Sequence, residues 1–136
     1  MARVLIIPCG SRGRALATEL RAAGYAVRGT TRGAHVEEIA AAGAEPYVGD
    51  PDRIGTLMDA LHGVTVVCWL MDGVEIPEGR VRMLWEKLVD TGVRGVVHAG
   101  GGEAIARASS QTWQIPLEVV EPGDDVSAAI ERLLGG

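Results

Sequence analysis

The first 23 residues constrain the fold most, because they predict a strand, a glycine turn and a helix in immediate succession. The apolar run at residues 4–7 is short and β-branched, which predicts a buried strand. Residues 9–13 form a small-residue turn, and beyond it Leu16, Ala17 and Leu20 recur at helical spacing. Such a turn leaves backbone N–H groups at a helix N-terminus, where the helix dipole favours an anion. The turn is therefore a candidate phosphate site.

The glycine spacing of this turn is incomplete. A dinucleotide-binding turn uses three glycines, each with its own role. Counting back from Gly13, the second glycine is Gly10 and the first position falls on Ile7. Gly13 is expected to let the helix pack closely on the strand, and Gly10 to let a pyrophosphate approach the backbone. Pro8 and Cys9 must then make the tight first turn, and two glycines also fit a turn that binds nothing.

The rest of the chain alternates between strand and helix patterns. Further strands are expected at residues 25–30, 44–48, 64–70, 93–99 and 117–120, and helices at 35–42, 54–61, 81–91, 103–111 and 124–134. We expect Asp52 to cap the helix at 54–61. This alternation predicts an α/β fold with a parallel sheet. Right-handed crossovers and the glycine turn favour a three-layer, doubly wound Rossmann fold with six strands in the order 3-2-1-4-5-6.

Length and composition exclude several classes of protein. The 136 residues, 47% of them hydrophobic, predict a single domain over residues 1–136. A net charge of −5 without a basic patch argues against nucleic acid, and no apolar run reaches the roughly 18 residues of a membrane span. Two cysteines and three scattered histidines form no disulfide framework or metal site. A cytoplasmic protein is expected.

The segment after the second strand bears on the cofactor. An NAD site usually carries an acidic residue about 20 residues after the glycine turn, whereas an arginine suits the 2′-phosphate of NADP. No Asp or Glu occurs between Gly24 and Val36, and Arg32 stands there next to Thr31. A guanidinium can hold a phosphate by two hydrogen bonds, and Arg12 is expected to reach the same phosphate. NADP is therefore predicted over NAD, unless Arg32 is only a solvated loop charge.

Several segments together resemble one family, the extended and atypical short-chain dehydrogenases/reductases. Residues 10–17 resemble their nucleotide-binding turn, 28–32 their cofactor-selecting loop, 48–52 their adenine-side turn, and 88–97 their fourth helix and fifth strand. The resemblance covers nearly the whole chain and implies a dinucleotide cofactor. The candidate cofactor-binding residues are Gly10, Ser11, Arg12, Gly13, Thr31, Arg32, Asp50, Pro51, Trp69, Leu70, Met71 and Ala99.

The catalytic residues of that family have no match in this sequence. The family uses a tyrosine as general acid or base, with a lysine four residues later, after the fifth strand. Here Tyr25 and Tyr47 lie far earlier, Lys87 precedes the fifth strand, and Ala99 takes the tyrosine's position. His98 is the acid/base residue at that strand end, where a histidine is more often structural. The family's long segment after the sixth strand is also missing, so no catalytic residue is assigned.

Three tryptophans bear on the cleft and on assembly. Trp69, with Leu70 and Met71, ends the fourth strand and is expected to line the nicotinamide side of a cleft, although core packing explains these residues equally well. Trp85 and Trp113 lie on or near the two helices that often pair between subunits in the resembled family. Exposed tryptophans there would indicate a homodimer, and buried ones would belong to the core.

Cys9 and Cys68 are expected to lie near each other, because strands one and four are neighbours in the predicted order. Two free thiols are the favoured interpretation, and a redox-sensitive cleft is the alternative.

Three functions stay open. The first is a Rossmann domain that binds NADP without dehydrogenase chemistry, for example a nucleotide sensor. The second is an NADPH-dependent oxidoreductase that works without a Tyr–Lys pair. The third is a structural or dimerisation module that has lost the ligand, which Ile7 at the first glycine position supports. Fold alone does not choose among them.

Overall fold

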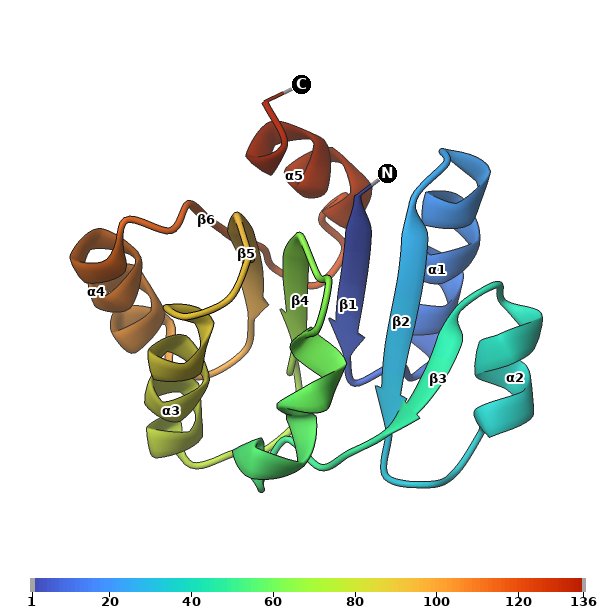
Figure 1. The fold of residues 1–136 in the computed structure, drawn as a ribbon, viewed down its shortest axis with the longest axis horizontal. Helices are drawn as coiled ribbons and strands as arrows, with labels where there is room; N and C mark the ends of the chain where they lie inside the picture. Colours follow the sequence, from blue (N-terminus) through green and yellow to red (C-terminus); the bar gives the residue numbers. More distant parts are fainter. Residues whose placement is uncertain (1, 136) are drawn as a thin grey trace.

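The computed structural model describes residues 2–135 and folds them around one parallel sheet (Figure 1). The strand order is β3-β2-β1-β4-β5-β6, as predicted. The strands are β1 Arg3–Ile7, β2 Ala26–Thr31, β3 Glu45–Val48, β4 Val66–Leu70, β5 Gly95–Ala99 and β6 Leu117–Val119. The helices are α1 Ser11–Ala22, α2 Val36–Ala41, α3 Glu78–Leu88, α4 Glu103–Trp113 and α5 Val126–Leu133, with two 3₁₀-helices, η1 Ile54–Leu57 and η2 Asp59–Leu61.

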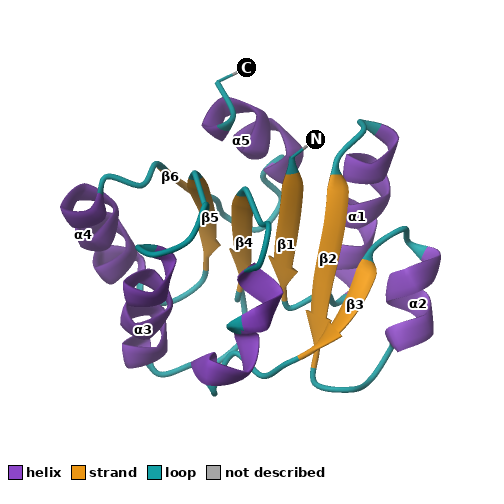
Figure 2. Cartoon of the chain, viewed as in Figure 1, coloured by secondary structure: helices purple, strands orange, loops and turns teal. Residues whose placement is uncertain are grey.

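Two hydrophobic clusters hold the three layers together, one on each face of the sheet. Val4 and Ile6 of β1 join the cluster under α1 and α5, whereas Leu5 and Ile7 join the cluster under α3, α4 and the 3₁₀-helices. Figure 2 shows helices on both sides of the sheet. A central strand that is buried on both faces needs apolar residues at every position, which explains its continuous apolar run.

The segment after β3 differs from the prediction. A single helix over 54–61 capped by Asp52 is wrong, because two short 3₁₀-helices form there and no side chain caps η1 from the flanking residue Arg53. The Asp52 carboxylate is instead engaged by Arg80 of α3, whose Nε lies 3.1 Å from its Oδ1. The Thr56 hydroxyl donates to the carbonyl of Arg53 at 2.7 Å and holds the first short turn.

The tryptophans separate into core and surface. Trp85 is fully buried among the residues under α3 and α4, so it belongs to the core and does not support a subunit contact. Trp113, at the end of α4, is 43% exposed, so the prediction of a homodimer contact stays open at this residue. No helix within residues 2–135 is long and apolar enough to cross a membrane.

Candidate functional site

The glycine turn joins the carboxyl end of β1 to the first turn of α1. It begins at a cis Ile7–Pro8 peptide, and Gly10 takes the position that flanks the helix start. In the described chain no side chain caps this helix end, and a Cβ added to Gly10 would meet no atom within 4 Å. Gly10 and Ser11 are exposed. The position just before α1 is therefore open and its helix end is uncapped, as a phosphate-binding turn requires.

Gly13 has the packing role that the sequence suggested. A Cβ at this position would lie 2.9 Å from Cγ2 of Ile6 and 3.1 Å from the carbonyl oxygen of Pro8. The residue is buried between α1 and β1. Only a glycine lets this helix approach its strand so closely.

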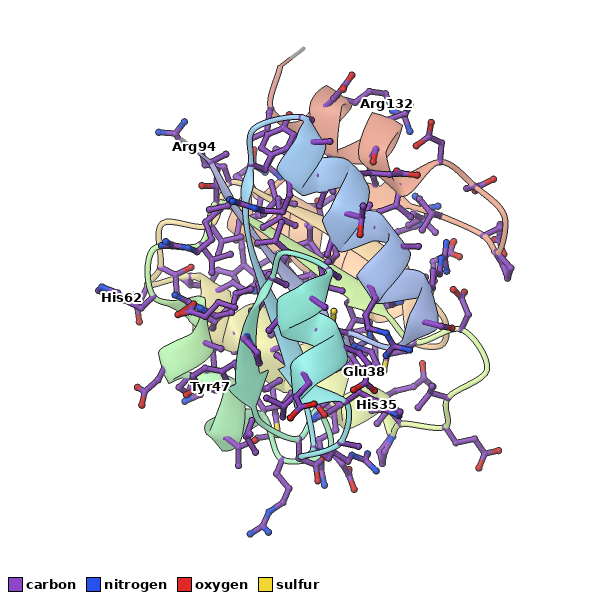
Figure 3. The ribbon with its side chains drawn as sticks, turned by 90° about the vertical axis from the view of Figure 1, so that its right-hand side faces the viewer. His35, Glu38, Tyr47, His62, Arg94 and Arg132 are labelled. Carbon is purple, nitrogen blue, oxygen red and sulfur yellow. The ribbon has the colours of Figure 1, made fainter. Side chains whose placement is uncertain are left out.

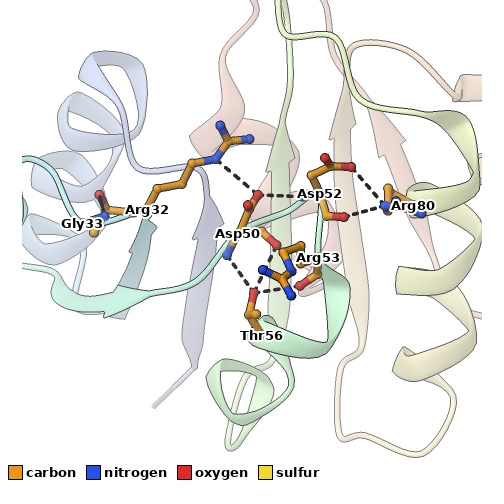
Figure 4. Close-up of polar contacts among 8 residues, drawn as sticks. Arg32, Gly33, Asp50, Asp52, Arg53, Thr56 and Arg80 are labelled. Carbon is orange, nitrogen blue, oxygen red and sulfur yellow. Dashed lines mark hydrogen bonds and ion pairs between the residues drawn. The ribbon is translucent and has the colours of Figure 1, made fainter.

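Arg32 leaves β2 at the same edge of the sheet and is held by a carboxylate from another loop. Its Nε lies 3.2 Å from Oδ1 of Asp50, and 63% of its side chain is exposed (Figure 4). The Thr31 hydroxyl donates to the carbonyl of Ala34 and accepts the N–H of Gly33, so it shapes the turn that presents Arg32. The dashed line in Figure 4 joins Asp50 to Nε of this guanidinium, and no line joins its terminal nitrogens to a residue drawn there.

A set of polar contacts fixes the loop that carries Asp50. The N–H of Asp50 donates to the Thr56 hydroxyl at 2.8 Å, and its Oδ1 accepts the N–H of Asp52 at 2.9 Å. Arg80 of α3 donates to the Asp52 carbonyl at 2.5 Å (Figure 4). Pro51 is buried in this turn. The adenine-side turn proposed from the sequence is thus a rigid loop that links β2 to α3 through charged groups.

The expected nicotinamide side is closely packed. Trp69, Leu70 and Met71 are 1%, 6% and 2% exposed, and Ala99 is fully buried. The Met71 N–H donates to the Ala99 carbonyl at 3.1 Å, so the chain segments after β4 and β5 touch. Their burial matches the core-packing interpretation of these strand ends.

Arg12 and Arg32 form their ion pairs on opposite sides of β1. Arg32 pairs with Asp50 on the side of β2 and β3, whereas Arg12 extends toward β4. Its Nη1 forms an ion pair with Asp72, which follows β4, and its Nη2 donates to the Glu121 carbonyl at 3.3 Å. We expected Arg12 to act beside Arg32, but the structure directs its guanidinium to the loops after β4 and β6. The sequence analysis missed Asp72, although an acidic residue just beyond a buried strand is a usable signal.

His98 lies at the end of β5 and is 1% exposed. Its Nε2 lies 3.0 Å from the Gly101 carbonyl oxygen. Burial lowers the pKa of His98, and the hydrogen bonds to the Gly101 and Gly100 backbone oppose this only in part. A neutral, enclosed imidazole that holds the turn after β5 fits the structural role expected from the sequence.

Arg28 is a second residue whose role the sequence did not reveal. It is a buried arginine on β2 and lies within the segment that resembles a cofactor-selecting loop. Its Nη1 donates to the carbonyls of Ala60 and His62 at 2.6 and 3.0 Å, and its Nε lies 2.5 Å from Oε1 of Glu45. Arg28 therefore stabilises the end of η2 and is structural.

Cys9 and Cys68 are both free and buried, and both belong to the cluster under α1 and α5. Cys9 turns toward β2, where its N–H donates to the Thr30 carbonyl at 2.8 Å. Its Sγ would lie 2.6 Å from a Cβ placed on Gly29. Burial raises the pKa of Cys9 to about 11 and raises that of Cys68 as well. Both thiols are therefore protonated at neutral pH and poor nucleophiles.

The amino ends of the strands carry a surface hollow, far from the glycine turn. Asp59, His62 and Asp90 contribute to its lining. Figure 3 shows the His62 and Arg94 side chains projecting outward, whereas His35 lies beside Glu38 at the start of α2, with 2.5 Å between Nδ1 and Oε2. Among residues 2–135, no group of three or more His, Cys, Asp or Glu could hold a metal ion. The charged pairs described above, Arg32–Asp50 and Arg12–Asp72, lie at the opposite, carboxyl edge of the sheet.

A parallel sheet of this order, with a glycine turn after β1, is a doubly wound Rossmann fold. The point where the strand order reverses, between β1 and β4, is where such folds bind their ligands. The candidate site is therefore the carboxyl edge of the sheet at β1 and β4, with Arg32 on one side and the Arg12–Asp72 pair on the other.

No family model matches the sequence, and no curated protein matches it. Solved structures share the fold. Triphenylmethane reductase of Citrobacter sp., complexed with NADP(H), has a TM-score of 0.68 at 15% identity over 87% of this chain and 48% of that chain. AtPrR2 with NADP+ and (+)pinoresinol has a TM-score of 0.66 at 17% identity, over 88% and 49%. A UDP-glucuronic acid 4-epimerase mutant from Bacillus cereus, in complex with NAD, has a TM-score of 0.69 at 13% identity, over 89% and 56%.

The chain spans about half the length of these three structures. At such low identity the likeness establishes the fold alone.

Proposed function

We propose that this chain binds NADP(H) at the carboxyl edge of its sheet and has no dehydrogenase activity of its own. A nucleotide sensor related to the short-chain dehydrogenases/reductases is the function that fits best. The proposed contacts are the glycine turn at residues 10–13 for the phosphates, Arg32 with Thr31 for the 2′-phosphate, and Asp50 with Pro51 for the adenosine side.

The proposal depends most on the exposure of Arg32 and on its contact with Asp50. This guanidinium is exposed, oriented through Nε by Asp50, and placed at the end of β2 where a doubly wound fold selects its cofactor. An arginine held in this way presents its terminal nitrogens as a fork that matches a phosphate group. Triphenylmethane reductase and AtPrR2, which share the fold, were solved with NADP(H) and NADP+.

The positions of the tyrosines and the lysine support the absence of dehydrogenase chemistry. Tyr47 lies on β3 at one edge of the sheet, and Tyr25 precedes β2. Lys87 is exposed in the last turn of α3. Ala99, at the end of β5, has no group that can transfer a proton.

Of the two alternative functions, only the structural module keeps specific support. An NADPH-dependent oxidoreductase without a Tyr–Lys pair would draw its hydride from the cofactor, but the buried His98 is poorly placed to donate a proton. A structural or dimerisation module is favoured by Ile7, which packs fully buried in the core at the first glycine position. The partly exposed Trp113 and Met83 on α4 and α3 are the residues that such a homodimer would cover.

Isothermal titration calorimetry with NADPH and NADH at low salt tests the proposal. We expect NADPH to bind and NADH to bind at least about tenfold more weakly, since one charge-assisted phosphate contact is lost with NADH. Equal affinities would remove the NADP preference. No heat with either nucleotide would favour the module that has lost its ligand.

A further inference from the structure

The two sides of the candidate site, over β1–β3 and over β4–β6, are closed to different degrees. In a doubly wound fold, one nucleotide of a dinucleotide lies over each half of the sheet, and the pyrophosphate lies at the start of the first helix. Here one half is formed by β1, β2 and β3, and the other by β4, β5 and β6. The two halves can therefore be compared as separate nucleotide sites.

The half over β1–β3 is open. Arg32 is 63% exposed on its side chain, and Gly10 has no atom within 4 Å of an added Cβ. The loop with Asp50 is already fixed by Thr56 and, through Asp52, by α3. An adenosine phosphate could enter here without breaking any of these loop contacts.

The half over β4–β6 is closed by Arg12. Its guanidinium joins the first turn of α1 to Asp72 after β4 and to the Glu121 carbonyl after β6. This bridge crosses the switch point between β1 and β4. The two charged side chains are 33% and 22% exposed, so water screens the pair only in part.

The strand ends beneath this bridge are filled by the protein itself. Met71 and Ala99 are 2% and 0% exposed, and Gly100 follows with a φ of +98°. A Cβ on Gly100 would lie only 2.5 Å from the Met71 carbonyl oxygen. A nicotinamide ring therefore finds no space between these strand ends and could lie only above them, on the side where Arg12 and Asp72 form their ion pair.

Charge adds to this closure. Asp72 places a carboxylate beside the helix N-terminus that would receive a pyrophosphate, and Arg12 is neutralised by it. Phosphate oxygens on this side meet an arginine whose two terminal nitrogens already have partners. Phosphate oxygens beside Arg32 meet a guanidinium that Asp50 contacts through Nε, and its terminal nitrogens have no partner among the described residues. The two sides of the site thus favour different parts of a dinucleotide.

We propose that this site recognises the adenosine 2′-phosphate half of its ligand, and that the Arg12–Asp72 pair keeps the nicotinamide half outside. This inference rests on the proposed binding of NADP(H). The ligand class is then an adenosine phosphate that carries a 2′-phosphate, with or without a nicotinamide nucleotide attached. Asp72 is the residue that determines how much of the dinucleotide is bound.

Calorimetry with adenosine 2′,5′-bisphosphate, NADPH and nicotinamide mononucleotide tests this. NADPH is used because its reduced ring is neutral and adds no attraction to Asp72. We expect the bisphosphate and NADPH to bind with dissociation constants within about threefold of each other, and nicotinamide mononucleotide not to bind. NADPH binding more than about threefold tighter than the bisphosphate would overturn the inference while leaving NADP(H) binding intact.

One variant tests the role of the bridge, with a matched control. Asp72→Asn removes the carboxylate and with it the ion pair, and Asp90→Asn removes the same charge at the amino ends of the strands. We expect the ratio of the bisphosphate dissociation constant to the NADPH dissociation constant to rise about fivefold in Asp72→Asn, because NADPH then gains contacts on the side of β4. A ratio equal to that of Asp90→Asn would overturn the inference. If neither ligand binds the unmodified chain, the proposed function itself fails.

Discussion

Nε of Arg32 lies 3.2 Å from Oδ1 of Asp50, although the two residues leave different strands, β2 and β3. The segment around Arg32 contains no acidic residue in the sequence. In the folded chain Asp50, from the loop after β3, lies beside Arg32. The carboxylate contacts the guanidinium through Nε, and no contact joins it to the terminal nitrogens (Figure 4). Asp50 therefore orients Arg32, and this orientation favours a bidentate phosphate contact.

Replacing Arg32 with alanine should narrow the preference for NADPH over NADH. A charge-assisted hydrogen bond to phosphate contributes about 1.5–3 kcal/mol, and NADH lacks that phosphate. NADPH should therefore weaken by roughly that amount, while NADH changes little. Calorimetric dissociation constants for both nucleotides measure the effect.

Arg94→Ala is the matched control for this change. Arg94 is also an exposed arginine, but it lies at the amino ends of the strands (Figure 3). The Arg94→Ala variant should bind NADPH and NADH with unchanged affinity. If Arg32→Ala and Arg94→Ala weaken NADPH equally, general charge attraction explains the binding and Arg32 selects nothing.

The two glycines of the turn should differ in their contribution to stability. Gly13→Ala places a Cβ 2.9 Å from Ile6 and 3.1 Å from a carbonyl oxygen, so α1 must move away from β1. Overpacking of this kind costs about 1–3 kcal/mol. Gly10→Ala meets open space, and its free energy of unfolding should change by less than about 1 kcal/mol. Urea unfolding of both variants measures the difference, and equal losses would contradict the close packing at Gly13.

The purified chain should not oxidise NADPH with small aldehydes, ketones or quinones above background. The reason is that Ala99, at the end of β5, carries no group that can donate a proton, and His98 beside it is buried. Absorbance at the NADPH band measures the rate. Gly10→Trp is the control, because Gly10 borders open space and a tryptophan there fills the turn without pushing α1 from β1. Robust turnover that Gly10→Trp abolishes would instead support the oxidoreductase alternative.

Strand order and the role of Gly13 were predictable because both depend on local patterns. Apolar runs bounded by glycines locate the strands, and crossover handedness orders them. The partners of Arg12, Arg28 and Arg32 were not predictable in this way. Each arginine contacts a loop distant in sequence, and an arginine reaches far enough to choose among several such loops. The wrong helix at 54–61 has a similar cause, since Arg80 of α3 engages the residue expected to cap it.

Cys9 and Cys68 should not form a disulfide in the folded chain. The predicted neighbourhood of β1 and β4 is confirmed, with Ile6 paired to Cys68. Cys9, however, packs over Gly29 of β2, while Cys68 lies on β4 beyond β1. Two strand spacings amount to about 9–10 Å, more than a disulfide spans. Mild oxidation followed by mass spectrometry should find two free thiols, and an intramolecular bond would restore the redox-sensitive cleft.

The same two thiols should make the fold less stable at high pH. Burial raises the pKa of Cys9 to about 11 from a usual 9.0, and raises the pKa of Cys68 too. Above about pH 9 the thiols ionise in the unfolded chain while the folded chain keeps their protons, so the unfolded state gains stability. The stabilisation is complete below about pH 9 and is lost as pH rises toward the folded pKa of Cys9. Urea unfolding between pH 7 and pH 11 measures this loss.

A Cys9→Ala, Cys68→Ala double variant isolates the contribution of the thiols from that of other groups that titrate at high pH. Its free energy of unfolding should fall less steeply above about pH 9 than that of the unmodified chain. A native-state thiol assay at pH 8 should also report slow labelling, with both thiols reacting at once in denaturant, since both are buried and protonated. Parallel pH profiles together with rapid native labelling would show that Cys9 is an accessible, ionised group beside the glycine turn.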